Sequence, residues 1–165
     1  MKAVVVYESL WGNTAAVARA VAEGIGGDTR ALHTDEAKGE AIAGADLIVA
    51  GAPLLGFALP TEQMREGTRN RPGKMPSPPD LAHASMRSWL DALAPGAGRA
   101  AAFETRIWWS PGSAAKTISE KLQALGYSPV GEPHRFMVRG AYGPLREGEL
   151  DKARAWGAEL AKAIG

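Results

Sequence analysis

Residues 3–14 decide the fold of this 165-residue chain, and they read Ala-Val-Val-Val-Tyr-Glu-Ser-Leu-Trp-Gly-Asn-Thr. The first five are apolar and include three consecutive valines, which predicts a strand buried on both faces. Residues 9–14 have the composition of a turn, and residues 15–25 show the apolar period of a helix that ends at a Gly-Gly pair. The stretch therefore predicts a strand, a loop and a helix in succession.

The same alternation continues to the end of the chain. Further strands are expected at residues 29–32, 45–50, 99–103 and 135–139, and further helices at residues 36–43, 85–90, 113–125 and 147–164. Strands that alternate with helices form parallel βαβ units with right-handed crossovers. The sequence therefore predicts one α/β domain over residues 1–165, with a doubly wound five-stranded parallel sheet between two helix layers.

One connection, residues 60–82, is much longer than the others. It is rich in proline and poor in apolar residues, and it carries four basic side chains, Arg65, Arg69, Arg71 and Lys74. A long irregular connection inside a compact domain is usually either functional or disordered. The sequence leaves both possibilities open.

The overall composition excludes several classes of protein. Cysteine is absent, which removes iron–sulfur clusters, disulfides and cysteine nucleophiles, and the three histidines lie far apart without metal-binding spacing. The formal net charge of +1 is too small for general binding to nucleic acid. No apolar run approaches the ~18 residues of a membrane span, and no signal peptide is recognisable, so we expect a cytoplasmic protein.

Ligands of such sheets bind beyond the carboxyl ends of the strands, where three loops are expected to meet. The first loop, residues 9–14, carries hydroxyl and amide groups and opens a helix, whose free N–H groups favour an anion. It holds no lysine or arginine, so neutral donors alone would bind a phosphate there. The Walker A and GxGxxG patterns are absent. A second interpretation, that Ser9 or Asn13 only caps the helix, stays open.

The other two loops are apolar or aromatic. The second loop, residues 52–59, is apolar and interrupted by glycine and proline, which suits a flat hydrophobic ligand. The third loop, residues 104–112, contains Trp108 and Trp109, and one of these rings could stack on an aromatic ligand. Alternatively, the second loop packs under the long connection and the tryptophans pack in a core or an interface. Together the three loops favour a mononucleotide.

Residues 4–14 resemble the FMN-phosphate signature of the flavodoxin family, a strand followed by [ST]-x-x-G-x-T at the start of a helix. Ser9, Gly12 and Thr14 match this signature, whereas Trp11 stands where flavodoxins usually carry threonine or serine. Residues 51–53 with Gly56 resemble the family's second loop, and residues 103–106 resemble its third. Residues 143–150 and 155–157 look like a subgroup common in high-GC bacteria.

The resemblance implies the strand order 2-1-3-4-5 and a noncovalent FMN that cycles between oxidised, semiquinone and hydroquinone states. The backbone carbonyl of Leu55 or Gly56 would accept from the flavin N5–H. Phe57 would shield one face of the ring, since Leu54 and Leu55 carry no aromatic ring. The residues expected to bind FMN are Ser9, Leu10, Trp11, Gly12, Asn13, Thr14, Ala52, Pro53, Leu54, Leu55, Gly56, Phe57, Glu104, Thr105, Arg106, Trp108, Trp109 and Gly112.

The implied function is one-electron transfer between redox partner proteins that the sequence does not name, by a monomer or weak dimer without catalytic residues or metal. Flavodoxins that carry electrons are strongly acidic, whereas this chain has a sequence pI near 8.0. We therefore expect weaker repulsion of the reduced flavin, and Arg106 near the ring would weaken it further. Two alternatives stay open: an FMN-dependent NAD(P)H:quinone oxidoreductase whose substrate site includes the long connection, and a binding module that has lost the cofactor.

Overall fold

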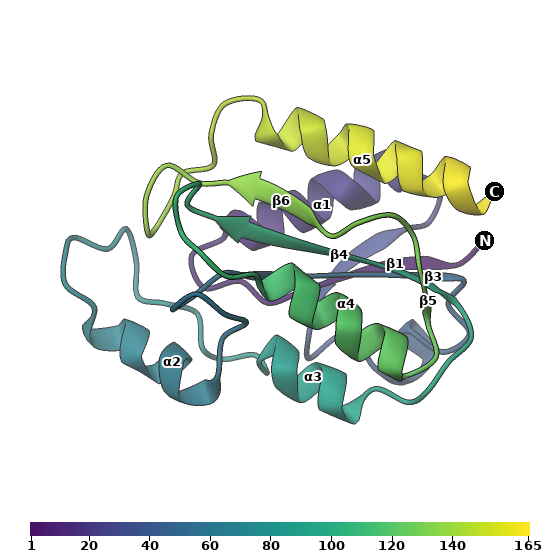
Figure 1. Ribbon diagram of the computed structural model, residues 1–165, viewed down its shortest axis with the longest axis horizontal. Coiled ribbons are helices and arrows are strands. Elements are labelled where there is room, and N and C mark those ends of the chain that lie inside the picture. Colours follow the sequence, from purple (N-terminus) through teal and green to yellow (C-terminus); the bar gives the residue numbers. More distant parts are fainter.

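The computed structural model describes all 165 residues, and a parallel β-sheet forms its central layer (Figure 1). The strand order is β2-β1-β3-β4-β5, with β6 paired to β4 beyond β5, so the expected order is confirmed. Every paired strand is parallel to its neighbour. The strands are β1 (Ala3–Tyr7), β2 (Arg30–His33), β3 (Leu47–Pro53), β4 (Arg99–Arg106), β5 (Ser128–Pro129) and β6 (His134–Met137).

Helices cover both faces of the sheet (Figure 1). One face carries α1 (Asn13–Ile25) and α5 (Glu149–Ile164), and the other carries α3 (Met86–Ala92) and α4 (Ala114–Ala124). The short α2 (Glu62–Gly67) lies beyond the carboxyl ends of the strands, and two 3-10 helices, η1 (Gly39–Ala41) and η2 (Thr68–Asn70), complete the chain. No helix is both long and apolar enough to cross a membrane.

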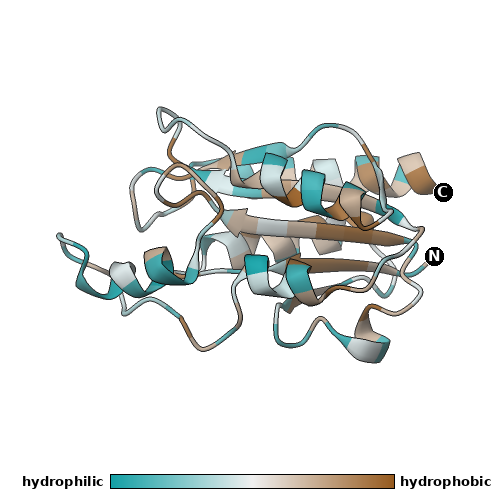
Figure 2. Ribbon diagram, turned by 60° about the horizontal axis from the view of Figure 1, so that its bottom comes forward, coloured by the Kyte–Doolittle hydropathy of each residue, from teal (hydrophilic) through white to brown (hydrophobic).

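The central strands are apolar on both sides because both sides are buried (Figure 2). Successive side chains of a strand point to opposite faces. In β1, Val4 and Val6 join the core beneath α3 and α4, whereas Val5 joins the core beneath α1 and α5. The continuous run of valines thus serves two cores at once, as the sequence predicted.

The edge position beside β4 is shared by two short strands. Ser128 and Pro129 of β5 pair with Arg99 and Ala100, and β6 begins where His134 pairs with Phe103. Four residues of the edge strand therefore face only two of β4, which makes a bulge at residues 130–133. Gly131, at φ 67°, and Pro133, which has no N–H to donate, both lie in this bulge. The strand expected at residues 135–139 is the part after it.

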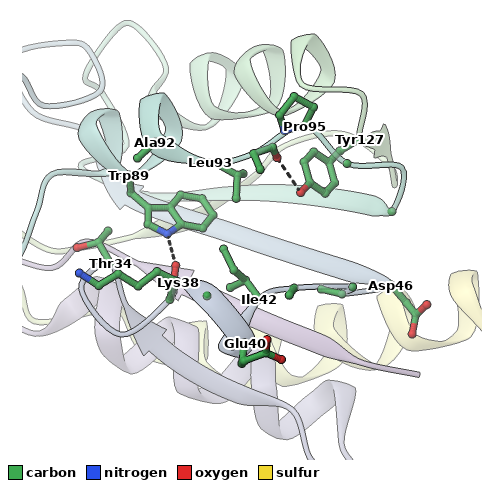
Figure 3. A pocket seen from close by; sticks show the side chains of 18 of the residues that line it. Thr34, Lys38, Glu40, Ile42, Asp46, Trp89, Ala92, Leu93, Pro95 and Tyr127 are labelled. Atoms are coloured by element: carbon green, nitrogen blue, oxygen red, sulfur yellow. Dashed lines mark hydrogen bonds between the residues drawn. The ribbon is translucent and has the colours of Figure 1, made fainter.

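The prediction of a helix at residues 36–43 is wrong. Only the 3-10 turn η1 forms, because Gly39 and Gly44 take left-handed φ values of 58° and 65°, which an α-helix does not contain. A hollow of about 980 Å³ lies between residues 34–46 and α3 with the loop after it (Figure 3). The Trp89 indole lines it and donates to the Ala37 carbonyl at 2.6 Å. None of the predicted site residues lines this hollow.

Further boundaries differ from the sequence prediction. β4 continues to Arg106 rather than ending at residue 103, so three residues expected in the third loop belong to a strand. β3 continues to Pro53 rather than ending at residue 50, so Ala52 and Pro53 of the expected second loop belong to a strand as well. The connection at residues 60–82 contains α2 and η2 and is therefore partly helical. These differences place more of the candidate site on regular structure.

Candidate functional site

The segments that follow β1, β3, β4 and β6 converge at the carboxyl edge of the sheet, as parallel strands require. They enclose a cavity of about 60 Å³, which is room for about two water molecules. Its lining is Ser9, Leu10, Trp11, Asn13, Thr14, Pro53, Leu54, Leu55, Arg71, Thr105, Arg106, Ile107, Val138 and Ala141. The structure thus brings together residues from all three predicted loops.

The first loop turns into α1 at Gly12, which has a left-handed φ of 94°. No side chain caps this helix. The Ser9 hydroxyl accepts from the Gly12 N–H at 3.1 Å, and the Asn13 amide donates to the Tyr142 carbonyl at 3.1 Å. The interpretation in which Ser9 or Asn13 caps α1 is therefore wrong, because both side chains bond elsewhere.

Five backbone N–H groups of this loop and of the first turn of α1 have no acceptor within the protein, those of Leu10, Trp11, Asn13, Thr14 and Ala15. The last three are first-turn amides of α1, where the helix dipole adds partial positive charge. Free amides around a helix start form a typical cradle for a phosphate group. The donors present at this loop therefore fit a phosphate.

A pair of buried hydroxyls joins the first loop to the third. Thr14 Oγ1 and Thr105 Oγ1 lie 2.8 Å apart, and both residues line the cavity. Thr14 lies in the first turn of α1 and Thr105 lies in β4, so the bond ties a helix start to the end of a central strand. The bond uses one of the two hydroxyl protons, so the other proton remains free to donate to a ligand.

Residues 71–83, here called the covering segment, cross over the first loop. The Asp80 N–H donates to the Leu10 carbonyl at 2.8 Å, and the Trp11 indole N–H donates to the Ser77 carbonyl at 3.2 Å. The Ser9 N–H donates to Nε2 of His83 at 3.3 Å. Trp11 thus binds the covering segment, which sequence reasoning did not anticipate. The proline-rich composition of residues 72–79 gave no signal of these partners.

A buried ion pair anchors α2 beneath the first loop. Glu8 is fully buried, and its Oε2 lies 3.2 Å from Nε of the buried Arg65. These two atoms are not aligned as a hydrogen bond, so their attraction offsets only part of the cost of burial. Burial raises the pKa of Glu8 to about 7, although the Met86 N–H, which donates to Oε1 at 2.8 Å, acts to lower it. In the sequence, this role of Glu8 could have been recognised from an acidic residue directly after a buried strand.

The charge expected on the third loop is neutralised. The Arg106 guanidinium donates to Oε2 of Glu104 at 2.9 Å and to the Gly112 carbonyl at 2.8 Å. The other Glu104 oxygen accepts from the Ser113 hydroxyl and the Ala115 N–H at the start of α4. Glu104 does not line the cavity. Arg106 itself lines the cavity, but Glu104 balances its charge, so it would weaken the repulsion of a reduced flavin less than an unpaired cation would.

The second loop forms a tight turn. Leu55 and Ala58 exchange two backbone hydrogen bonds around Gly56 and Phe57, whose φ values are 55° and 67°. Leu54 and Leu55 line the cavity, whereas the Phe57 ring is 57% exposed. Trp108 and Trp109 are 64% and 62% exposed and do not line the cavity either. The predicted aromatic shields thus lie at the surface in this structure.

Several solved structures have a similar fold, among them flavodoxins. An archaeal flavodoxin superposes with a TM-score of 0.71 at 23% identity, covering 99% of both chains. Flavodoxin 1 from Bacillus cereus gives 0.68 at 22% identity over 100% of both chains. The flavodiiron core of Flv1 from Synechocystis sp. PCC6803 gives 0.64 at 20% identity, where this chain spans 36% of its length.

No protein-family model matches the sequence, and no curated protein matches it either. The likeness therefore lies in the fold: this chain has the flavodoxin fold. The resemblance seen in the sequence is confirmed at that level.

The Glu8 carboxyl should make stability depend on pH. Its pKa of about 7 lies above the ordinary 4.5, so the folded state holds the proton more tightly than the unfolded state does. Between these values the free energy of unfolding should fall as pH rises, by on the order of 3 kcal/mol in total. Urea denaturation of the wild type and of Glu8→Gln across this pH range measures this effect. The free energy of unfolding of the wild type minus that of Glu8→Gln should become smaller or change sign as pH rises.

The difference between wild type and variant removes the contributions of other nearby titrating groups to the pH dependence of stability. Burial lowers the pKa of His83, which makes stability rise with pH in part of the same range and cancels in the difference. Glu62→Gln is the matched control, because Glu62 also contacts Arg65 but is exposed. It should keep most of the wild-type dependence, because burial contributes more to the raised pKa of Glu8 than the charge of Glu62 does. A difference between wild type and Glu8→Gln that does not change with pH contradicts the assignment.

Proposed function

We propose that this protein binds FMN and transfers electrons between partner proteins. The observation that carries the proposal is the set of five unpaired amides at the start of α1, beside the buried hydroxyls of Thr14 and Thr105. This donor set fits the phosphate of a mononucleotide. The flavodoxin fold supports the same assignment, since the strand order places this loop at the switch point.

The flavin ring would lie against the apolar side of the cavity. Pro53, Leu54, Leu55 and Ile107 supply that side, from the second and third loops. The cavity of about 60 Å³ is smaller than a mononucleotide, so the two loops would separate as the ring enters. Phe57, Trp108 and Trp109 stand exposed on these same loops and would cover the ring after such a movement.

When bound, FMN supplies one-electron redox chemistry. The chain's own contribution is to bind the phosphate, hold the ring in an apolar site and present a hydrogen-bond acceptor. Of the two carbonyls expected near the flavin N5, that of Leu55 accepts from the Ala58 N–H within the turn. The Gly56 carbonyl has no donor within the protein and is the better candidate.

The cavity lining favours an electron carrier over an oxidoreductase that transforms a substrate. None of the lining residues is histidine, aspartate, glutamate, lysine or tyrosine, so no side chain there exchanges protons near neutral pH. Arg106 is held by Glu104. A carrier needs no such group, because electrons leave through the exposed ring edge.

The partner proteins would present acidic surfaces. Three cations at the carboxyl edge of the sheet form no ion pair. Lys74 lies near the start of the covering segment, Lys116 lies in the first turn of α4, and Arg139 follows the end of β6. All three side chains are exposed, and their elements place them at the same edge as the exposed aromatic rings. Opposite charges on a partner would steer its approach to this edge.

The direct test is the visible absorption spectrum of the purified protein before and after excess FMN. The proposal expects flavin bands displaced from those of free FMN, and slow bleaching when NAD(P)H is then added. Rapid bleaching by NAD(P)H would instead favour the oxidoreductase. A colourless protein that leaves the spectrum of added FMN unchanged contradicts the proposal and favours the binding module.

Gly56→Val tests the turn in the second loop. A β-branched residue at φ 55° is strained, so we expect the free energy of unfolding to fall by about 1–2 kcal/mol. Displacement of the Gly56 carbonyl should also shift the reduction potential of bound FMN. Potentiometric titration and urea denaturation measure the two effects. Gly67→Val, in open space at the end of α2, is the control and should leave the potential unchanged. An unchanged potential in Gly56→Val refutes the role of that carbonyl.

A further inference from the structure

Arg71 reaches the candidate phosphate site from a distant part of the sequence. It follows η2 at the start of the covering segment, and its backbone N–H donates to the Thr68 carbonyl at 3.3 Å. Its half-buried side chain lines the cavity together with Ser9, Trp11 and Asn13 of the first loop. No ion pair or hydrogen bond within the protein engages its guanidinium.

The two other arginines of the same connection form ion pairs within the protein. Arg65 pairs with Glu8, and Arg69 pairs with Glu66 at 2.8 Å. The only other cation that lines the cavity, Arg106, pairs with Glu104 at 2.9 Å. No aspartate or glutamate lines the cavity. Arg71 therefore contributes the one uncompensated charge of the cavity, and that charge is positive.

The backbone beside Arg71 is fixed to the first loop. The Pro72 carbonyl accepts from the Tyr142 hydroxyl at 3.0 Å. The Tyr142 ring packs edge-on against Trp11 with centroids 4.7 Å apart, and its carbonyl accepts from the Asn13 amide. These contacts tie the backbone beside Arg71 to Trp11 and Asn13 of the first loop, which carry two of the unpaired amides.

We propose that Arg71 binds the phosphate of the mononucleotide and makes the site select FMN over riboflavin. This inference rests on the proposed function and replaces the expectation that neutral donors alone hold the phosphate. A guanidinium offers two parallel N–H donors and a full charge to a dianionic phosphate, in addition to the five amides. The long connection thereby becomes part of the binding site.

The test compares two ligands that differ only in the phosphate. Affinities of FMN and riboflavin are measured by quenching of flavin fluorescence for the wild type and for Arg71→Gln. FMN should bind about ten- to a hundredfold more weakly to the variant, because a charged hydrogen bond is lost, whereas riboflavin affinity should stay the same. Arg71→Lys keeps the charge but not the two parallel N–H donors, so its affinity for FMN should lie between those of the wild type and Arg71→Gln. Added salt should weaken FMN binding more in the wild type than in Arg71→Gln.

Arg69→Gln is the matched control, because it removes the same charge from the same connection at an exposed position outside the cavity. It should leave both affinities unchanged. Circular dichroism confirms that the variants fold, as expected for a side chain without partners in the protein.

Three results would overturn the inference. Unchanged FMN affinity in Arg71→Gln, or an equal loss of FMN and riboflavin affinity, removes the phosphate role while the proposed function stands. A wild type that binds neither flavin removes the proposed function and this inference with it.

Discussion

The turn at Gly12 is the constraint on which the candidate site depends. Its left-handed φ of 94° lets the chain pass from a doubly buried strand directly into α1. No side chain caps the helix, so its first amides stay free, together with those of Leu10 and Trp11. A buried sheet edge thus ends in a concentration of N–H donors that the protein does not satisfy. Such donors are stabilised by an anion, and that requirement defines the site more strongly than any single side chain.

The rest of the carboxyl edge is organised around this loop. The buried Glu8–Arg65 pair fixes α2 beneath it, and the covering segment is held over it by hydrogen bonds to Leu10 and Trp11. Thr105 ties it to β4, and Tyr142 ties it to the segment after β6. The enclosed space is small as a result. Binding of a mononucleotide therefore exchanges contacts among the loops for contacts with the ligand, rather than filling a preformed hole.

The sequence predicted the sheet well and the covering contacts poorly. The valines of β1 must be apolar on both faces because two cores meet there, so the pattern alone was sufficient. The helix predicted at residues 36–43 does not form, because Gly39 and Gly44 adopt a left-handed backbone. Apolar periodicity carries no information about such a backbone conformation. The roles of Arg71 and Trp11 depend on partners about 60 residues away, and no local pattern encodes such pairing. Glu104 and Arg106 were expected in the third loop but lie in β4, and their mutual neutralisation depends on the start of α4.

The central claim is that the first loop holds a phosphate dianion, and the phosphorus NMR signal of FMN tests it most directly. The phosphate of free FMN gains a proton as the pH falls through about 6, which moves its signal. In the complex, the amides of the first loop should hold the phosphate as a dianion, so its signal should stay in place across that range. A phosphorus signal that titrates in the presence of the protein as it does for free FMN would contradict the account.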